Sequence, residues 1–252
     1  MELSWINDCT IWMDLYIATD TKTEIILVLY HKLKWTIDAA RDLLFKPKYV
    51  PKEFWRKKHE NEGFAAVGIR RLTEEQNAFW YDRMKIDLLS YLKRINLDIS
   101  DKSVLEIGPG TGYWTELIQE LGCSNYLGID ISESAVDKLS EKFSSYNFLS
   151  GDFSEMDING KWDIVVMIHV DEHIHGENFV KSMNSIKNII QGGGIFIVSA
   201  YHPEKKSWVP HVEYHGISDF TSVFPKEWVV DPVMPFADDL IVGITPPFNS
   251  KI

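Results

Sequence analysis

The chain is poor in cysteine and in long apolar runs. Only Cys9 and Cys123 occur among 252 residues, which excludes a framework of several disulfides and a cysteine zinc site. The longest apolar candidate, residues 25–29, is far shorter than the roughly 20 residues that a membrane-spanning helix needs. The opening MELSWINDC has acids where a secretory leader would carry basic residues. We therefore expect a globular protein in the reducing cytoplasm.

Basic charge is also scarce. Lys and Arg number 26 against 37 Asp and Glu, a net charge of -11, and such a field repels a polyanion, so nucleic acid is not an expected partner. Segment 32–59 is the exception, with nine Lys or Arg against three acids. A solvated helix face is the plain interpretation. An anionic ligand, a peripheral membrane contact through 32–59 and a homodimer stay open.

Helical periodicity marks the first hundred residues. Apolar residues at steps of three and four predict a helix over 24–45, which Pro47 and Pro51 end. Thr73 and Gln76 have the spacing of a capping box, and the apolar stripe that follows predicts a second helix ending near Arg94.

Strand and helix patterns alternate after residue 101, which indicates βαβ units around a parallel sheet. The predicted strands are 103–107, 125–129, 146–149, 162–168 and 194–200, and the predicted helices are 114–121, 134–143 and 177–190. Two last apolar runs, 228–234 and 240–245, predict an antiparallel hairpin at the sheet edge.

A glycine-rich turn is the most informative stretch. In VLEIGPGTGYWTELI, residues 104–118, an apolar strand leads through Gly108, Gly110 and Gly112 into a helix. Such glycines let a ligand lie against the main chain near the amides that begin the helix. A dinucleotide fingerprint needs its third glycine where Tyr113 stands. The sequence therefore does not favour a nicotinamide-dependent oxidoreductase.

EIGPGTG resembles the first motif of class I S-adenosylmethionine-dependent methyltransferases. YLGIDIS, SGDF, WDIVVMIHVDEHI and QGGGIFIVSA continue the likeness in the family's order. The resemblance implies an α/β, Rossmann-like class I methyltransferase fold, with a mainly parallel seven-stranded sheet, an antiparallel edge hairpin and an N-terminal helical extension. It also implies two regions: a helical extension or lid over 1–71 and a methyltransferase domain over 72–252.

The resemblance further implies S-adenosylmethionine as the cofactor. Asp130 is then the acid that accepts both ribose hydroxyls, Asp152 binds the adenine amino group and Phe153 lies beside the adenine ring. The full implied set is Glu106, Gly108, Gly110, Gly112, Asp130, Ile131, Asp152, Phe153 and Ile168. Structural roles remain the alternatives: Glu106 facing a helix, Asp130 capping one and Asp152 forming a turn.

The loop after the fourth predicted strand is rich in bases. Transfer from a sulfonium is mostly a matter of alignment, but a hydroxyl or protonated amine must also lose a proton. His173 and Ile174 align with a His-Ile pair of the family, so His173 is the preferred base, oriented by Asp171 or Glu172, and His169 is the competitor.

A metal site is the other interpretation of this loop. His169, Asp171, His173 and His175 alternate and would share a face if the strand continued. The apolar run before them is already long enough to be the whole strand, and a loop would scatter the side chains. No metal is therefore expected.

Acceptor contacts are expected after the fifth strand. That segment mixes flat apolar rings with polar tips, which suits a sugar ring or an aromatic metabolite. The candidates are Tyr201, His202, His211, Tyr214 and His215, together with Arg70 near a helix that closes over the cofactor in similar enzymes. Filling of the core is the alternative, above all for Trp208.

We therefore predict transfer of a methyl group from S-adenosylmethionine to a hydroxyl of a small molecule or glycan. The base-rich loop favours oxygen, and the NPPF and NPPY signatures of amide methylation are absent from the sequence. Two alternatives stay open: a non-catalytic scaffold that binds S-adenosylmethionine or S-adenosylhomocysteine, and an N-methyltransferase acting on a small amine.

Overall fold

The computed structural model describes residues 33–34, 36–37, 49–61, 67–69, 72–205, 207 and 211–247. The helix predicted over 24–45 falls almost entirely outside these residues, as do Arg70 and Trp208. Within the described ranges, no helix combines the length and the apolar character needed to cross a membrane.

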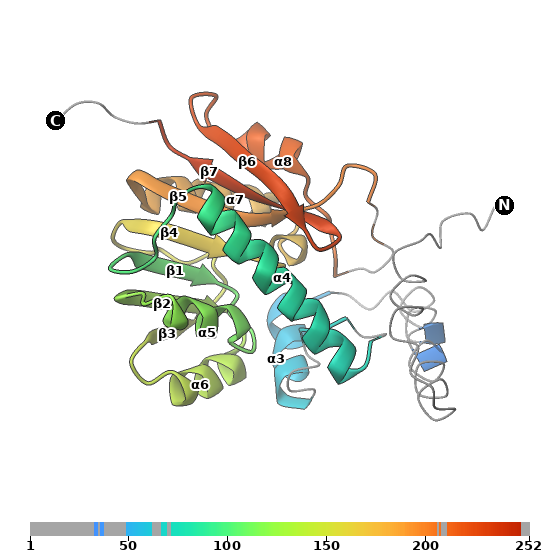
Figure 1. The fold of residues 1–252 in the computed structure, drawn as a ribbon. Helices are drawn as coiled ribbons and strands as arrows, with labels where there is room; N and C mark the ends of the chain where they lie inside the picture. The colour runs from blue at the N-terminus through green and yellow to red at the C-terminus, as the bar shows by residue number, and fades with distance from the viewer. Residues whose placement is uncertain are drawn as a thin grey trace.

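One sheet of seven strands organises the domain, in the order β3-β2-β1-β4-β5-β7-β6 (Figure 1). Neighbours from β3 to β5 pair in parallel, whereas β7 pairs antiparallel with β5 and β6. This arrangement confirms the predicted parallel sheet with its antiparallel edge hairpin. The strands are β1 (Ser103–Ile107), β2 (Asn125–Asp130), β3 (Asn147–Ser150), β4 (Trp162–Met167), β5 (Ile190–Ala200), β6 (Val229–Phe236) and β7 (Asp239–Thr245).

Four helices agree with the sequence patterns to within a few residues. They are α4 (Glu74–Arg94), α5 (Tyr113–Glu120), α6 (Glu133–Lys142) and α7 (Glu177–Ile189). The capping box of α4 is confirmed, because the Gln76 amide donates to Thr73 Oγ1 at 3.2 Å and the Thr73 amide donates to Gln76 Oε1 at 3.0 Å. Local chemistry therefore sets where this helix begins.

Two further helices were not predicted, α3 (Pro51–Asn61) and α8 (Ile217–Val223). The end of the helix predicted over 24–45 lies outside the described residues, whereas Pro51 is the first residue of α3. Proline suits that position because its fixed φ is helical and its missing N–H has no helical partner there. Helix α8 is seven residues long, too short for a clear apolar period.

The strands separate two apolar cores by simple alternation. Val104 and Ile164 pack with α4 and α5 on one side of the sheet, and Leu105 and Val165 pack with α7 and α8 on the other. Successive strand residues point to opposite faces, so each buried strand feeds both cores. The sheet is therefore covered by helices on both faces, and ligand access is left to its edges.

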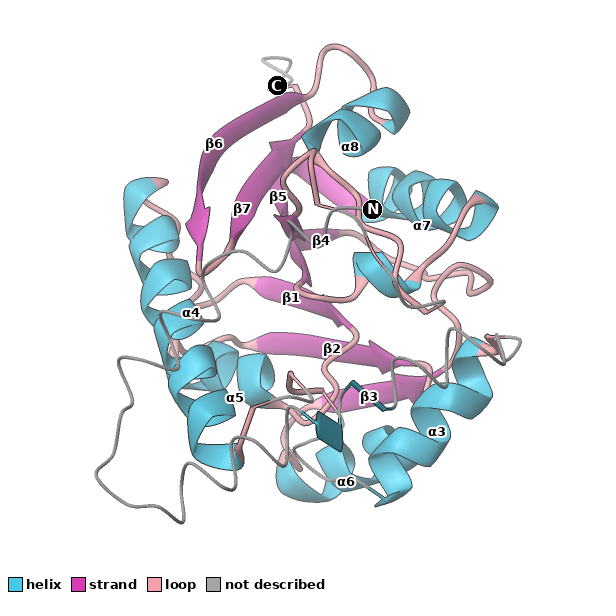
Figure 2. Ribbon diagram, turned by 90° about the vertical axis from the view of Figure 1, so that its right-hand side faces the viewer, coloured by secondary structure: helices cyan, strands magenta, loops and turns pink. Residues whose placement is uncertain are grey.

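Helix α3 lies at the carboxyl edge of the parallel strands. In Figure 2 the arrowheads of β1, β2 and β3 point toward the side on which α3 lies. The helix packs against α6, where the Lys138 ammonium donates a hydrogen bond to the carbonyl of His59. Lys58 is only 7% exposed, so part of the basic segment 32–59 faces the domain. A membrane contact through this segment stays a prediction.

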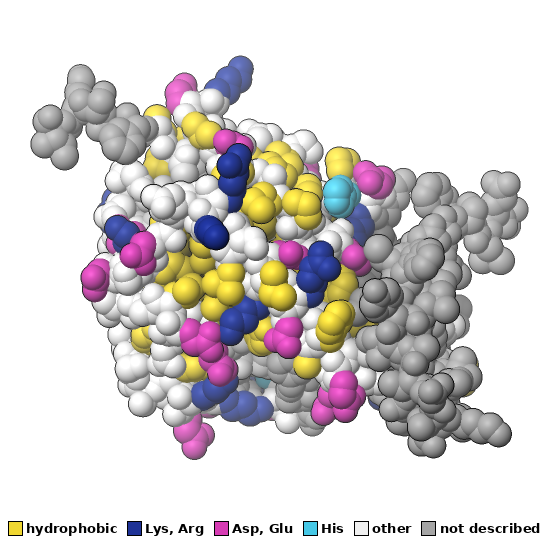
Figure 3. Space-filling view, viewed as in Figure 1, with side chains coloured by type: hydrophobic (Ala, Val, Ile, Leu, Met, Phe, Trp, Pro, Cys, Tyr) yellow, Lys and Arg dark blue, Asp and Glu magenta, His cyan; other side chains and the backbone are white. Residues whose placement is uncertain are grey.

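Apolar side chains gather on the outer face that α4 and β6 present (Figure 3). Phe79 and Ile86 of α4 are 57% and 61% exposed, and Val229 and Val233 of β6 are 52% and 40% exposed. The homodimer that the sequence leaves open stays a prediction.

Candidate active site

Two loops meet at the carboxyl edge between β1 and β4. These strands are neighbours although they are far apart in the chain, so the loops that follow them leave the sheet side by side, at the point where α/β sheets bind ligands. A Cβ added to Gly108 in the first loop would lie 2.4 Å from Val170 Cγ2 in the second. The two loops are therefore in direct contact, and Gly108 is needed for that contact.

The glycine loop has a left-handed backbone at three positions. Gly108, Gly110 and Gly112 have φ of +70°, +57° and +83°, a region that residues with a Cβ rarely adopt. A Cβ on Gly110 would lie 3.0 Å from Val67, and one on Gly112 would lie 2.6 Å from Leu139. The main chain of this loop is thus approached closely from several sides, as the sequence motif predicts.

Asp130 ends β2 beside the glycine loop. Its Oδ1 accepts the amide of Ser132 at 2.9 Å, and its Oδ2 accepts the amide of Gly110 at 3.0 Å. The residue is 5% exposed, and burial raises its pKa against the opposing effect of His59. Each carboxylate oxygen can accept a further hydrogen bond. Asp130 therefore orders the loop and still has acceptor capacity for a ligand.

His59 reaches this acid from α3. The residue is 4% exposed, and neither imidazole nitrogen has a hydrogen-bond partner among the described residues. Burial lowers the pKa of His59, while Asp130 opposes that change. The imidazole is therefore neutral near pH 7. No sequence motif singled out this residue.

Glu106 lies inside the domain, beneath the glycine loop. The residue is 2% exposed, and its Oε2 accepts hydrogen bonds from the hydroxyls of Thr115 at 2.8 Å and Tyr126 at 2.5 Å. Burial raises the pKa of Glu106 to about 7, although both hydroxyls oppose the rise. These contacts match the alternative of a structural acid facing a helix.

The other residues implied for the cofactor divide between a turn and the core. Asp152 Oδ1 accepts the amide of Ser154 at 2.9 Å and its hydroxyl at 2.7 Å. Phe153 and Ile168 are each 5% exposed and belong to the two apolar cores, and Ile131 is half-buried. Their contacts with a cofactor stay predictions.

The loop after β4 turns away from the strand direction at once. His169 has a φ of +54°, and Asp171–His173 form a single 3-10 turn. The alternation that could have supported a metal site is thereby broken. In the part of the chain that the structure describes, no three His, Cys, Asp or Glu side chains come together to hold a metal ion.

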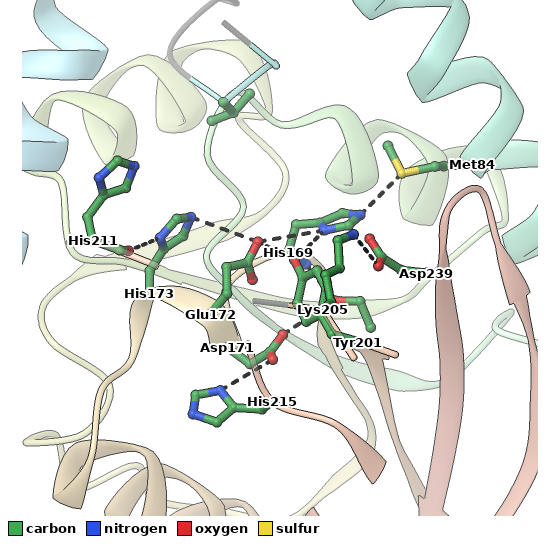
Figure 4. Close-up of polar contacts among 12 residues, drawn as sticks. Met84, His169, Asp171, Glu172, His173, Tyr201, Lys205, His211, His215 and Asp239 are labelled. Atoms are coloured by element: carbon green, nitrogen blue, oxygen red, sulfur yellow. Dashed lines mark hydrogen bonds and ion pairs between the residues drawn. The ribbon is translucent and has the colours of Figure 1, made fainter. Parts of the chain in front are cut away.

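Glu172 is the centre of a buried polar cluster (Figure 4). Its Oε1 accepts the hydroxyl of Tyr201 at 2.6 Å, and it lies 3.7 Å from His169 Nδ1 and 3.9 Å from His173 Nε2. Burial alone would raise the pKa of Glu172, but His173, His169 and Tyr201 outweigh burial and lower it to about 2. The carboxylate is therefore ionised at neutral pH.

His169 uses both ring nitrogens in this cluster. Nδ1 lies 3.0 Å from the hydroxyl of Tyr201, and Nε2 lies 3.3 Å from Met84 Sδ. Because Tyr201 donates its proton to Glu172, its oxygen accepts from His169 Nδ1. Burial would lower the pKa of His169, but Glu172 outweighs burial and raises it. His169 is thus suited to being the cationic partner of Glu172.

His173 has a different arrangement. Its Nδ1 lies 2.7 Å from the backbone carbonyl of His211, and since a carbonyl only accepts, Nδ1 carries the proton. Nε2 is left with a lone pair on the side of Glu172. Burial lowers the pKa of His173 against the opposing effect of Glu172. At neutral pH the ring is uncharged and can accept a proton at Nε2.

Asp171 points away from His173, into the domain. The residue is fully buried, its Oδ1 accepts the hydroxyl of Ser199 at 3.4 Å, and its Oδ2 lies 3.6 Å from His215 Nδ1. Burial raises the pKa of Asp171 well above its ordinary value. His215 in turn stacks on Phe179 at 3.9 Å. Asp171 and His215 therefore support the loop from behind (Figure 4).

The remaining acceptor candidates are spread around the cluster. Tyr201 is 3% exposed, and its ring packs on that of Tyr214 at 4.4 Å, with the Lys205 ammonium over both rings. His202 is exposed. His211 packs its ring against Phe54 of α3 at 4.6 Å. Arg70 lies outside the described residues.

Helix α3 supplies residues that the sequence patterns did not single out. Trp55 packs edge-on against His173, with ring centroids 4.7 Å apart, and Tyr49, just before the helix, packs on His175 at 5.2 Å. Trp55 and His59 are four residues apart, so they lie on one face of the helix. That spacing, just after a proline that can begin a helix, is the signal that could have found them.

Comparison with known proteins places these features in context. A family model described as "Methyltransferase domain" matches residues 79–227. Ribosomal protein L11 methyltransferase of Dictyoglomus turgidum is 31% identical over 106 residues, which is 40% of this chain and 33% of that protein. Ubiquinone biosynthesis O-methyltransferase of Rickettsia bellii is 28% identical over 116 residues, 44% of this chain and 47% of that protein. The chain thus spans between a third and a half of these relatives.

Solved structures share the fold. Magnesium protoporphyrin IX methyltransferase from Synechocystis, with bound S-adenosylmethionine, superposes with a TM-score of 0.60 at 16% identity, covering 79% of this chain and 99% of that one. N-methyltransferase NodS from Bradyrhizobium japonicum, in complex with S-adenosylhomocysteine, has a TM-score of 0.53 at 16% identity, covering 65% and 86%.

Proposed function

The chain belongs to the methyltransferase-domain family of class I S-adenosylmethionine-dependent enzymes, and we propose that it transfers a methyl group to a hydroxyl of a small molecule or glycan. The observation that carries the proposal is the state of His173. The His211 carbonyl holds its Nδ1 proton and leaves Nε2 able to accept one. A hydroxyl acceptor needs such a base.

The edge between β1 and β2 fits the cofactor. Asp130 is a buried carboxylate with acceptor capacity, and it lies near enough to the buried imidazole of His59 for each to affect the other's pKa, while that imidazole has no partner among the described residues. Such a pair suits a ligand with adjacent hydroxyl groups. The glycine loop and Asp130 would hold the nucleoside, and Asp152 would contact its base. When bound, S-adenosylmethionine supplies an electrophilic methyl group.

His173 is the proposed general base. Its Nε2 would accept the proton of the acceptor hydroxyl while the methyl group supplied by the cofactor passes to the oxygen, the carbon–sulfur bond breaks and S-adenosylhomocysteine leaves. The resulting imidazolium keeps its Nδ1 hydrogen bond to the His211 carbonyl, and its new Nε2 proton lies on the side of Glu172, 3.9 Å away. Because Glu172 is ionised, it stabilises the charge that develops on the ring.

His169 is less suited to the role. Both of its nitrogens already face Tyr201 and Met84, and its raised pKa keeps it protonated over more of the pH range. We assign it to holding Tyr201 and Glu172 in place. Asp171, whose carboxyl faces His215, positions the same loop from the core side.

The cover over His173 favours a small acceptor. Trp55 and His211 pack beside the His173 ring, with centroids 4.7 Å and 5.8 Å away, and Phe54 extends this aromatic surface. Flat rings suit an aromatic metabolite or the apolar face of a sugar. A folded protein surface would have to displace α3 to reach the base.

The test is methyl transfer from labelled S-adenosylmethionine to three acceptor sets: phenols and sugars, small primary amines, and ribosomal protein L11. Mass spectrometry of the product identifies the methylated atom. We expect oxygen methylation of a phenol or sugar. Products methylated only at nitrogen, or only on the protein, would contradict the proposal. Tight cofactor binding without turnover on any set would support a non-catalytic scaffold instead.

A further inference from the structure

Helix α3 buries a polar side chain for which the described residues offer no partner. The His59 residue is 4% exposed and neither ring nitrogen makes a hydrogen bond. Buried polar groups in proteins are almost always paired, so an orphaned pair of nitrogens needs an explanation. The helix is firmly placed at this point, because the His59 carbonyl accepts a hydrogen bond from Lys138 of α6. A ligand is the partner we consider.

The electrostatic neighbour of this imidazole is Asp130. The two side chains affect each other's protonation, yet no hydrogen bond or ion pair joins them among the contacts of the described residues. Asp130 binds Gly110 and Ser132 and has acceptor capacity left. A neutral imidazole adds one donor and one acceptor. Together the two side chains match a ligand group that both donates and accepts.

We propose that His59 is a ribose-binding residue, whose imidazole holds the hydroxyls of the cofactor ribose from the side opposite Asp130. The inference rests on the proposed cofactor site at Asp130. Adjacent hydroxyls can donate to the carboxylate and exchange a hydrogen bond with the imidazole. One ligand then pairs the two free ring nitrogens of His59 and uses the remaining acceptor capacity of Asp130.

The same helix would link the cofactor to the base. Trp55 lies one turn before His59 and packs against His173. A ribose held under His59 therefore holds Trp55 over the base as well. Cofactor binding and the covering of His173 are in this way two contacts of one rigid element.

The experiment is calorimetric titration of the full chain with S-adenosylhomocysteine and with an analogue that lacks both ribose hydroxyls. The variants are His59→Leu, which fills the buried site with an apolar side chain, and His59→Gln, which keeps a donor and an acceptor. Lys52→Ala, an exposed change on the same helix, is the control, and Asp130→Ala tests the cofactor site itself.

We expect His59→Leu to weaken S-adenosylhomocysteine about tenfold, as one or two neutral hydrogen bonds are lost. We expect His59→Gln to recover most of the affinity and Lys52→Ala to have no effect. The penalty of His59→Leu should vanish with the analogue, because that ligand has no hydroxyl to bind. Circular dichroism and thermal melting check that each variant is folded.

Two results would overturn the role of His59 alone: wild-type affinity in His59→Leu, or an equal loss for both ligands, which marks a packing effect. If His59→Leu does not fold, His59→Ala takes its place on both ligands, and an equal loss of affinity for the two overturns the inference. An Asp130→Ala variant that binds like the wild type would instead remove the cofactor site on which the inference rests.

Discussion

Two glutamates are buried near the carboxyl edge of the same sheet, and their chemistry is opposite. Glu106, at 2% exposure, has a pKa raised to about 7, and Glu172, at 6%, has one lowered to about 2. Each accepts a tyrosine hydroxyl, at 2.5 Å and 2.6 Å. Burial is therefore not what separates them.

The difference lies in the other neighbours. Glu106 has a second hydroxyl, from Thr115, whereas Glu172 has two imidazoles within 4 Å. A hydroxyl cannot carry positive charge, so it compensates only part of the desolvation of a carboxylate, while an imidazole can become a cation. The region under the glycine loop is thus built to hold the fold, and the loop after β4 is built to keep a charge.

The largest expected effect is on catalysis, from a change in the loop after β4. His173→Ala should lower kcat by about 10² to 10⁴, the usual contribution of a general base, and leave the affinity for S-adenosylhomocysteine unchanged. Steady-state kinetics and calorimetry measure the two quantities. Lys226→Ala, at an exposed position that belongs to no proposed site, is the control, and a His173 variant with full turnover would remove this residue from the mechanism.

Glu106, under the glycine loop, should make the stability of the fold depend on pH. The pKa of Glu106 is about 7 in the folded chain against an ordinary 4.5, so its contribution is fully present below pH 4.5 and is lost as the pH rises to 7. Glu106→Gln removes this dependence, and relative to the wild type it should gain about 3 kcal/mol of unfolding free energy between pH 4 and pH 8.

Urea denaturation of both proteins across that pH range provides the measurement. Glu155→Gln, at an exposed position, is the control and should leave the pH dependence of the unfolding free energy as it is in the wild type. If the difference in unfolding free energy between Glu106→Gln and the wild type stays constant with pH, then folding does not raise the pKa of Glu106.

Glu172→Gln should have a smaller effect on catalysis than loss of the base. The neutral amide no longer raises the pKa of His173, so the acid limb of the kcat/KM profile should move further below pH 6.5. Turnover on the plateau should fall about 10- to 150-fold, because a charge-assisted contact to the imidazolium is worth about 1.5–3 kcal/mol. An unchanged pH profile would separate Glu172 from the base.

The contrast between the two glutamates also shows what a sequence can predict. Glu106 stands in a short apolar run, and this run and the glycines after it identify both the strand and the loop. Asp130 ends the next strand in the same way, so its position at the sheet edge follows from the pattern. These elements are predictable because local periodicity and turn chemistry agree with the tertiary packing.

Glu172 had no such pattern. Three polar residues in succession, Asp171, Glu172 and His173, form a 3-10 turn, and sequence spacing does not indicate which of them turns inward. The segment 211–215, far along the chain, decides their different environments. Its His211 carbonyl holds His173, and its His215 ring lies beside Asp171. Helix α3 was missed for a similar reason, since Pro51 can end one helix or begin another.

The smallest expected effects come from removing the tyrosine hydroxyl that each glutamate accepts. Tyr126→Phe removes a hydroxyl that lowers the pKa of Glu106, so this pKa should rise further, with a loss of about 1 kcal/mol of stability at pH 8. Tyr201→Phe should change the pKa of Glu172 less, because His173 and His169 dominate it. Carbon-13 NMR titration of labelled glutamate in both variants measures the two shifts. A larger shift at Glu172 than at Glu106 would mean that the hydroxyl, rather than the imidazoles, keeps Glu172 ionised.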